Sequence, residues 1–89
     1  MARYSVFIKP SALKELERVG LKSDRQRIVE HIRSLADDPH LPGSLRLSGA
    51  DKYRLRCGHY RILYTIEHDR LVVCVIRIGH RRDVYRGIG

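Results

Sequence analysis

The segment "YRLRCGHYRILYTI", residues 53–66, alternates apolar and cationic side chains on either side of a two-residue Gly-His step. Successive side chains of a strand point to opposite faces, so Leu55 and Cys57 share one face while Arg54 and Arg56 share the other. A connection as short as Gly-His forces the two strands into an antiparallel hairpin. The segment therefore predicts paired strands with one apolar face, which the rest of the chain must cover, and one cationic face.

The alternation extends this hairpin into strands over residues 52–57 and 60–67. A further strand is expected in "RYSVFIK", residues 3–9, and another in "RLVVCVIRI", residues 70–78. The last strand is joined to the hairpin through the dipeptide His-Asp. It is apolar on both faces, which favours a central place in the sheet with the first strand beside it.

Two segments between the first strand and the hairpin repeat apolar residues at helical spacing. The first helix follows Pro10, with Ser11 as its N-cap and Gly20 at the C′ position. The second follows Ser23, which forms a capping box with Gln26. The segment "DDPHLPG" ends it. The very short connection predicts an antiparallel helical hairpin packed against the sheet.

These elements predict one α+β domain over residues 1–89, since a chain of 89 residues is too short for two separate cores. The order is β-α-α-β-β-β, a mainly antiparallel four-stranded sheet with a two-helix hairpin packed on one face. The apolar runs are too short to span a membrane or form a signal-peptide core, so a cytoplasmic protein is expected.

The charge is strongly unbalanced, with 18 Lys and Arg against 10 Asp and Glu, a formal net charge of +8 and a pI near 10.1. Such a domain attracts polyanions, of which nucleic acid is the commonest, although a merely soluble cationic surface explains composition equally well. The two cysteines make no disulfide framework. Cys57 and His59 lack a second Cys/His pair at ligand spacing, so neither a metal nor a cofactor is expected.

The positions of the cations favour nucleic acid. Lys52, Arg54 and Arg56 face away from the helices, and the hairpin places Arg61 across from them. No acid interrupts the outward positions from Lys52 to Thr65. Alternatively, this is only a solvated face whose cations discourage edge-to-edge aggregation. The segment that follows the last strand adds guanidinium and aromatic groups, which suit RNA: His80, Arg81, Arg82 and Tyr85.

Several motifs make the sequence recognisable. They are "Y-x-V-x-I-x-x-S-A-x-K-E-L" at residues 4–16, "DP" at the end of the second helix, the hairpin itself and "IGHRRDVY" at residues 78–85. The Gly-x-Tyr-Arg-hydrophobic-hydrophobic-Tyr block followed at this distance by His-Arg-x-x-x-Tyr is the most specific. With these motifs the chain resembles the RelE/ParE toxin superfamily, and within it the RelE-like branch of ribosome-dependent mRNA endonucleases.

The resemblance implies the fold described above and an mRNA interferase that cleaves messenger RNA in the ribosomal A site. A ribose 2′-hydroxyl attacks the adjacent phosphate, without a metal. The resemblance places the family's basic strand positions on Lys52 and Arg54, its phosphate-binding arginine on Arg61, its later arginine on Arg81 and its C-terminal aromatic on Tyr85. It also implies a RelB-like antitoxin with a disordered arm that folds on binding, and oligomers formed mainly through that antitoxin.

Physical chemistry assigns roles within this set. Guanidinium groups of Arg61 and Arg81 can stabilise the charge on a phosphorane, with Arg56 as a possible helper. Lys52 can move a proton if neighbouring cations favour its neutral form, whereas Arg54 cannot deprotonate. His80 is either the proton-transfer group or, as we favour, a structural residue at the strand end. Arg56, His80 and Arg82 are expected to bind RNA.

Two rival functions stay open at this point. ParE-like members of the superfamily share the fold but poison DNA gyrase, and they would not need Arg61, Arg81 and Tyr85. A basic RNA- or ribosome-binding module without chemistry is the other rival, because one fold hosts unrelated functions.

Overall fold

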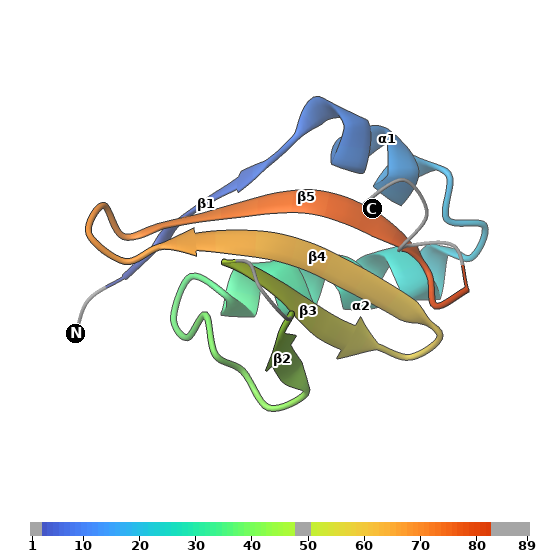
Figure 1. Cartoon of the computed structure of the whole chain (residues 1–89). Helices are drawn as coiled ribbons and strands as arrows, with labels where there is room; N and C mark the ends of the chain where they lie inside the picture. Colours follow the sequence, from blue (N-terminus) through green and yellow to red (C-terminus); the bar gives the residue numbers. More distant parts are fainter. Residues whose placement is uncertain (1–2, 48–50, 83–89) are drawn as a thin grey trace.

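Five strands form one mixed sheet, and two helices cover one of its faces (Figure 1). The structure is a computed structural model that describes residues 3–47 and 51–82. Its elements are β1 (Ser5–Ile8), α1 (Pro10–Glu17), α2 (Lys22–Ser34), β2 (Ser44–Arg46), β3 (Lys52–Cys57), β4 (Tyr60–Glu67) and β5 (Val72–His80). The strands lie in the order β1-β5-β4-β3-β2. We call the sheet face that points away from the helices the outer face.

The expectation of four strands is wrong, whereas three of the four strand pairings are antiparallel, as expected of a mainly antiparallel sheet. The three-residue strand β2 adds a fifth strand antiparallel to β3, and it is too short to show an alternating pattern. β1 does lie beside β5 as expected, but the two run parallel, with Ser5 opposite Val72 and Ile8 opposite Val75. Strand direction depends on where the helical hairpin returns the chain, which side-chain alternation does not encode.

The predicted start and end of α1 are both displaced. The helix begins at Pro10, with Lys9 in the cap position, so Ser11 lies inside the first turn and makes no capping hydrogen bond. Proline is suited to the first helical position because its φ is already helical and its missing N–H would have had no partner. The helix ends one residue early, with Arg18 as its C-cap, so Gly20 lies one residue beyond the C′ position.

The predicted capping box of α2 is also wrong. The helix begins one residue before Ser23, after Leu21, and no side chain caps it. The guanidinium of Arg25 instead donates a short hydrogen bond to the carbonyl oxygen of Val19, which ties α2 to the end of the preceding turn. No helix in the described part of the chain is long and apolar enough to cross a membrane.

The two hairpin connections differ from each other. Gly58 and His59 form the predicted two-residue turn between β3 and β4, and Gly58 has φ +60°, as the first residue of a type II′ turn requires. The predicted His-Asp turn before β5 is instead four residues long, residues 68–71. Leu71 has φ +53°, a left-handed conformation that reverses the chain and keeps Leu71 out of the strand.

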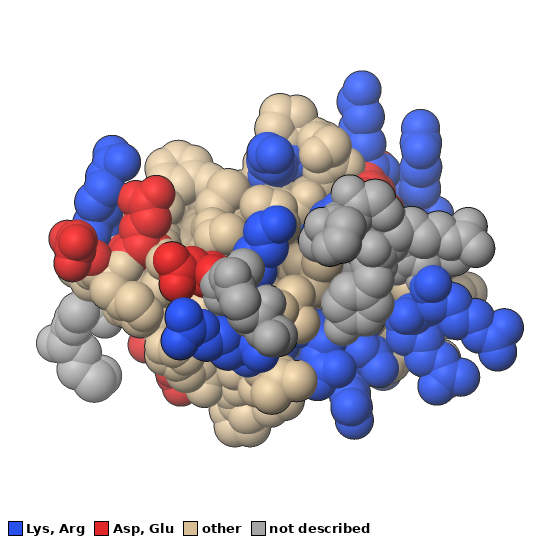
Figure 2. Space-filling model, in the orientation of Figure 1, with Lys and Arg blue, Asp and Glu red and all other residues tan. Residues whose placement is uncertain are grey.

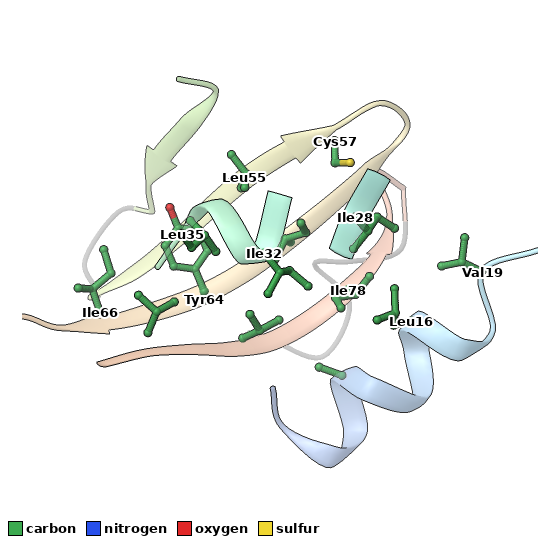
Figure 3. Close-up of a cluster of buried hydrophobic side chains, with 14 residues drawn as sticks. Leu16, Val19, Ile28, Ile32, Leu35, Leu55, Cys57, Tyr64, Ile66 and Ile78 are labelled. Atoms are coloured by element: carbon green, nitrogen blue, oxygen red, sulfur yellow. The ribbon is translucent and has the colours of Figure 1, made fainter. Parts of the chain in front are cut away.

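The core lies between the helices and the inward face of the sheet (Figure 3). α2 contributes Ile28 and Ile32, which belong to the same buried cluster as Leu55 of β3 and Tyr64 of β4. The side chain of Tyr64 is fully buried, and its hydroxyl donates a hydrogen bond of 2.7 Å to the carbonyl oxygen of Pro39. This bond satisfies the one polar atom of the ring, which would otherwise be costly to bury.

A β-bulge interrupts the alternation of β5. Tyr64 pairs with Val75, but the next residue of β4, Leu63, pairs with Arg77, so Ile76 is an extra residue. As a result Val75 and Ile78 are both buried in the core although they are three residues apart. Every residue of β5 after the bulge therefore faces the side opposite to the one that strict alternation predicts.

α1 takes the place of β1 along the edge of β5 beyond the bulge. β1 ends opposite Val75, and the next inward residue, Ile78, donates its backbone N–H to Oε1 of Glu15 at 3.0 Å. Oε2 of the same carboxylate lies 3.4 Å from Nε of Arg77, which forms an ion pair. Glu15 thus fixes α1 to the strand that carries the bulge.

Burial makes the free energy of unfolding depend on Tyr64 at high pH. Desolvation raises the pKa of Tyr64 to about 12 from its ordinary value of 10.0. The unfolded chain loses this proton first, so the stabilisation is complete below about pH 10 and is lost as the pH rises to about 12. We expect Tyr64→Phe to be less stable at neutral pH by about 1 kcal/mol, through the lost hydrogen bond, and to lose less stability above pH 10.

Urea unfolding of both proteins between pH 8 and pH 11.5 measures this difference. Equal slopes of stability against pH above pH 10 in wild type and Tyr64→Phe would contradict the assignment.

Candidate nucleic-acid interface

The hairpin places four cations side by side on the outer face. In the register of β3 and β4, Arg56 pairs with Arg61, Arg54 with Leu63 and Lys52 with Thr65. The predicted separation of faces is confirmed, because Leu55 and Cys57 on the other side of β3 are buried in the core. We call the set Lys52, Arg54, Arg56 and Arg61 the cationic face.

Two of these guanidinium groups are oriented in different ways. Nη1 of Arg61 donates to the carbonyl oxygens of Gly58 at 3.3 Å and of Tyr60 at 3.1 Å, which holds the side chain against the β3–β4 turn. Nε of Arg54 is buried and has no hydrogen-bond partner among the residues that the structure describes. A buried donor without a partner is costly, and an anionic oxygen of a ligand would satisfy it.

The end of β5 reaches the same corner of the sheet. Gly79 pairs with Arg61, and the backbone N–H of Arg81 donates to the carbonyl oxygen of His59 in the β3–β4 turn at 2.8 Å. Arg81 and Arg82 are both exposed there. The structure therefore brings five of the eight predicted site residues to one region: Lys52, Arg54, Arg56, Arg61 and Arg81. Tyr85 lies outside the described residues.

His80 lies on the other side of the sheet from Arg61. It pairs with Tyr60, whose side chain packs against the core, and its ring contacts the rings of Tyr60 at 5.9 Å and His59 at 6.3 Å between centroids. Its Nδ1 accepts the backbone N–H of Arg82 at 3.3 Å. These contacts match the structural role that we favoured for His80, while a role in RNA binding for His80 and Arg82 stays a prediction.

Acidic and basic side chains are unevenly distributed over the face that Figure 2 shows. Lys and Arg side chains gather over the β3–β4 turn, on the right of the view, and Asp and Glu gather over the β4–β5 turn, on the left. Three acids form ion pairs with arginines: Asp37 with Arg3, Asp51 with Arg46 and Glu67 with Arg70. A polyanion is therefore attracted most strongly to the end of the sheet that carries the β3–β4 turn.

Arg77 is a further cation on the outer face, and it was not among the predicted site residues. Strict alternation from Val73 and Val75 directs Arg77 into the core, and only the bulge at Ile76 turns it outward. The sequence does contain a signal for this bulge. Strict alternation from Val75 would bury the charged Arg77 and expose the apolar Ile78, and one extra residue between Val75 and Arg77 avoids both. Arg77 borders Leu63, which is fully buried on the outer face.

Other reactive groups are unsuited to catalysis. Burial raises the pKa of the Cys57 thiol from its ordinary value of 9.0, so at neutral pH it is a protonated and weak nucleophile. Its Sγ lies 3.6 Å from Nδ1 of His31, within the core side of the hairpin. Within residues 3–47 and 51–82, no group of three His, Cys, Asp or Glu side chains is placed to hold a metal ion. The chemistry of this corner is that of concentrated positive charge.

Sequence and fold comparisons agree on the family. The family described as "ParE toxin of type II toxin-antitoxin system, parDE" matches residues 6–85. A putative RelE-like toxin protein of Escherichia coli is 32% identical over 88 residues, which cover 93% of this chain and 90% of the relative. Toxin RelG of Mycobacterium tuberculosis (strain ATCC 25618 / H37Rv) is 40% identical over 84 residues, 93% of this chain and 97% of RelG.

A solved structure shares the fold. The archaeal RelE of the RelE–RelB complex from Pyrococcus horikoshii OT3 superposes with a TM-score of 0.79 at 26% identity, over 94% of this chain and 100% of that one. The chain belongs to the RelE/ParE family, and it is a RelE-like toxin of a type II toxin–antitoxin system. The predicted resemblance is confirmed.

The cationic face should reduce the stability of the free protein. Like charges opposite one another on neighbouring strands repel, so we expect Arg56→Gln to raise the free energy of unfolding by roughly 0.2–1 kcal/mol at low salt. The gain should shrink as added salt screens the repulsion. Urea unfolding at 20 mM and 500 mM NaCl measures both effects.

Arg70→Gln is the matched control, because Arg70 is an exposed arginine that pairs with Glu67 at the acidic end. Arg70→Gln should not raise the free energy of unfolding at either salt concentration. A loss of stability in Arg56→Gln that is the same at both salt concentrations would show that the cationic face is not under electrostatic strain.

Proposed function

We propose that this toxin is a metal-independent endoribonuclease that cleaves messenger RNA in the ribosomal A site, in the cytoplasm, and so inhibits translation. The observation that carries the proposal is the convergence of Arg54, Arg56, Arg61 and Arg81 on one corner of the sheet. Most of the acids visible in Figure 2 lie at the opposite end of the sheet, over the β4–β5 turn. The RelE-like toxins among the similar proteins support the same conclusion.

The proposed reaction is an intramolecular phosphoryl transfer within the RNA. The ribose 2′-oxygen forms a bond to the adjacent phosphorus, and the bond from phosphorus to the 5′-oxygen of the next nucleotide breaks. The products are a 2′,3′-cyclic phosphate and a 5′-hydroxyl. Negative charge builds on the phosphorane oxygens, and we assign its stabilisation to Arg61, whose Nη1 is held at the β3–β4 turn by the Gly58 and Tyr60 carbonyls.

The remaining cations have supporting roles. Arg54 offers a buried Nε donor that has no hydrogen-bond partner within residues 3–47 and 51–82, and we assign it to an oxygen of the RNA backbone. Arg81 follows β5 at the same corner and stabilises the phosphorane together with Arg61. Lys52 is the candidate for proton transfer, and Tyr85 for stacking on a base.

The test is a reconstituted translation assay with primer extension on the messenger RNA. Wild type should cut within codons only when ribosomes are present, and Arg61→Ala and Arg81→Ala should each slow cleavage by about 100-fold or more. Arg70→Ala, at the acidic end, is the charge-matched control and should cut as wild type does.

Intact messages together with a supercoiling defect of DNA gyrase would favour the ParE-like alternative. Tight ribosome binding without any cut would favour a non-catalytic binding module. Either result would contradict the proposed nuclease.

We also propose that a RelB-like antitoxin binds this chain, as RelB accompanies RelE in the Pyrococcus horikoshii complex. Two surfaces offer attachment. One is the cationic face, and the other is a groove between β1 and α2 with an apolar floor of Val6, Ile8, Val29 and Ile32. Arg3 and Arg33 line the same groove, so both surfaces suit an acidic segment that orders on binding.

Isothermal titration of the toxin with the product of the neighbouring reading frame tests this pairing. We expect submicromolar affinity that weakens at high salt, because cations line both surfaces. Absence of binding at micromolar concentrations would count against the pairing.

A further inference from the structure

Gly79 occupies an unusual place on the cationic side of the sheet. It is an internal residue of β5, paired with Arg61 on β4, and the bulge at Ile76 turns its Cα toward the outer face. Its backbone does not need glycine, because the glycines with positive φ in the described residues are Gly43 and Gly58. Glycine weakens a strand interior, and where no turn or bend requires it, it often marks a close approach of a ligand or another backbone.

The row of residues that crosses the sheet at this level differs from its neighbours. Arg56 lies opposite Arg61, and Arg61 lies opposite Gly79. At the far end of the row the backbone N–H of Arg56 donates to the carbonyl oxygen of Gly43 at 3.3 Å. Two arginines are therefore flanked on both sides by residues without side chains.

The adjacent rows have side chains at every position on β3, β4 and β5. One row carries Arg54, Leu63 and Arg77, and the next carries Lys52, Thr65 and Cys74. Among these three rows of described residues, Gly79 is therefore the β5 position at which the residue's own side chain does not separate the strand backbone from a ligand on the outer face.

We propose that Gly79 is a positioning residue for the substrate, and that the sugar–phosphate backbone of the cleaved RNA crosses β5 directly over it. The inference rests on the proposed nuclease function and adds the path of the RNA, which runs across the strands from Arg56 over Arg61 to Gly79. Only hydrogen at this position lets the scissile phosphate settle beside the guanidinium of Arg61.

The geometry gives the reason. Cβ atoms of directly opposed residues on neighbouring antiparallel strands stand about 4.5–5.5 Å apart. A side chain at position 79 would therefore rise beside the stem of Arg61. Arg61 has little room to move away, since Gly58 and Tyr60 carbonyls hold its Nη1. The phosphate would be displaced, and a displacement of about 1 Å can cost 100-fold in rate.

The experiment compares Gly79→Ala and Gly79→Val with wild type in single-turnover cleavage of A-site messenger RNA at saturating toxin. Cys74→Val is the matched control, because Cys74 lies on the same strand and the same face, two rows away. We expect the cleavage rate to fall by about 10-fold for alanine and about 100-fold for valine. The thermal midpoint and co-sedimentation with ribosomes should not fall, and Cys74→Val should cleave at nearly the wild-type rate.

The outcomes separate this inference from the function on which it rests. A wild-type protein that cuts no message removes both. If wild type cuts and folded Gly79→Ala and Gly79→Val cut equally fast, the nuclease stands and the role of Gly79 is overturned. If the valine variant unfolds, the folded alanine variant decides. A rate per folded molecule equal to that of wild type would mean that Gly79 serves only folding, which also overturns the proposal.

Discussion

The extra residue at Ile76 in β5 is the constraint on which the functional end of the sheet depends. It lets β5 bury Val75 and Ile78 on one side while turning Gly79 to the other, next to Arg61. Without the bulge, the two-residue period would direct Gly79 toward the core and Ile78 toward solvent. Burial of the Ile78 side chain therefore stabilises the β-bulge. The bulge in turn determines which residues of β5 lie beside the cations of β3 and β4.

The sheet tolerates this concentration of charge because its other face supplies the stability. Residues of both helices and of β3, β4 and β5 form one apolar cluster, within which the hydroxyl of Tyr64 is satisfied by the Pro39 carbonyl. Arg56 and Arg61 face each other across the hairpin with no acid at that level of the register. A binding site for a polyanion requires such repulsion, and relief comes when the ligand neutralises it.

Much of this arrangement could be predicted, and the failures have physical reasons. The faces of β3 and β4 followed from alternation, because a core on one side enforces the register of an amphipathic hairpin. The capping box at Ser23 failed because Arg25 closes the turn before α2 through the Val19 carbonyl. The turn before β5 was misplaced because leucine rarely adopts the left-handed conformation that Leu71 has here, so its residue type does not predict a turn. Arg77 was not predicted to lie on the outer face because the prediction assumed strict alternation along β5, which the extra residue at Ile76 interrupts.

The amino-acid sequence alone determined the amphipathic hairpin, the two helices, the excess of positive charge and the family to which the chain belongs. These properties are local or compositional, since they depend on side chains within a few positions of one another. The tertiary structure alone decided that β1 runs parallel to β5, that Glu15 replaces β1 along the edge of that strand, and that Gly79 and Arg81 arrive beside Arg61. Those contacts join residues far apart in the chain, and their geometry comes from how the whole core packs.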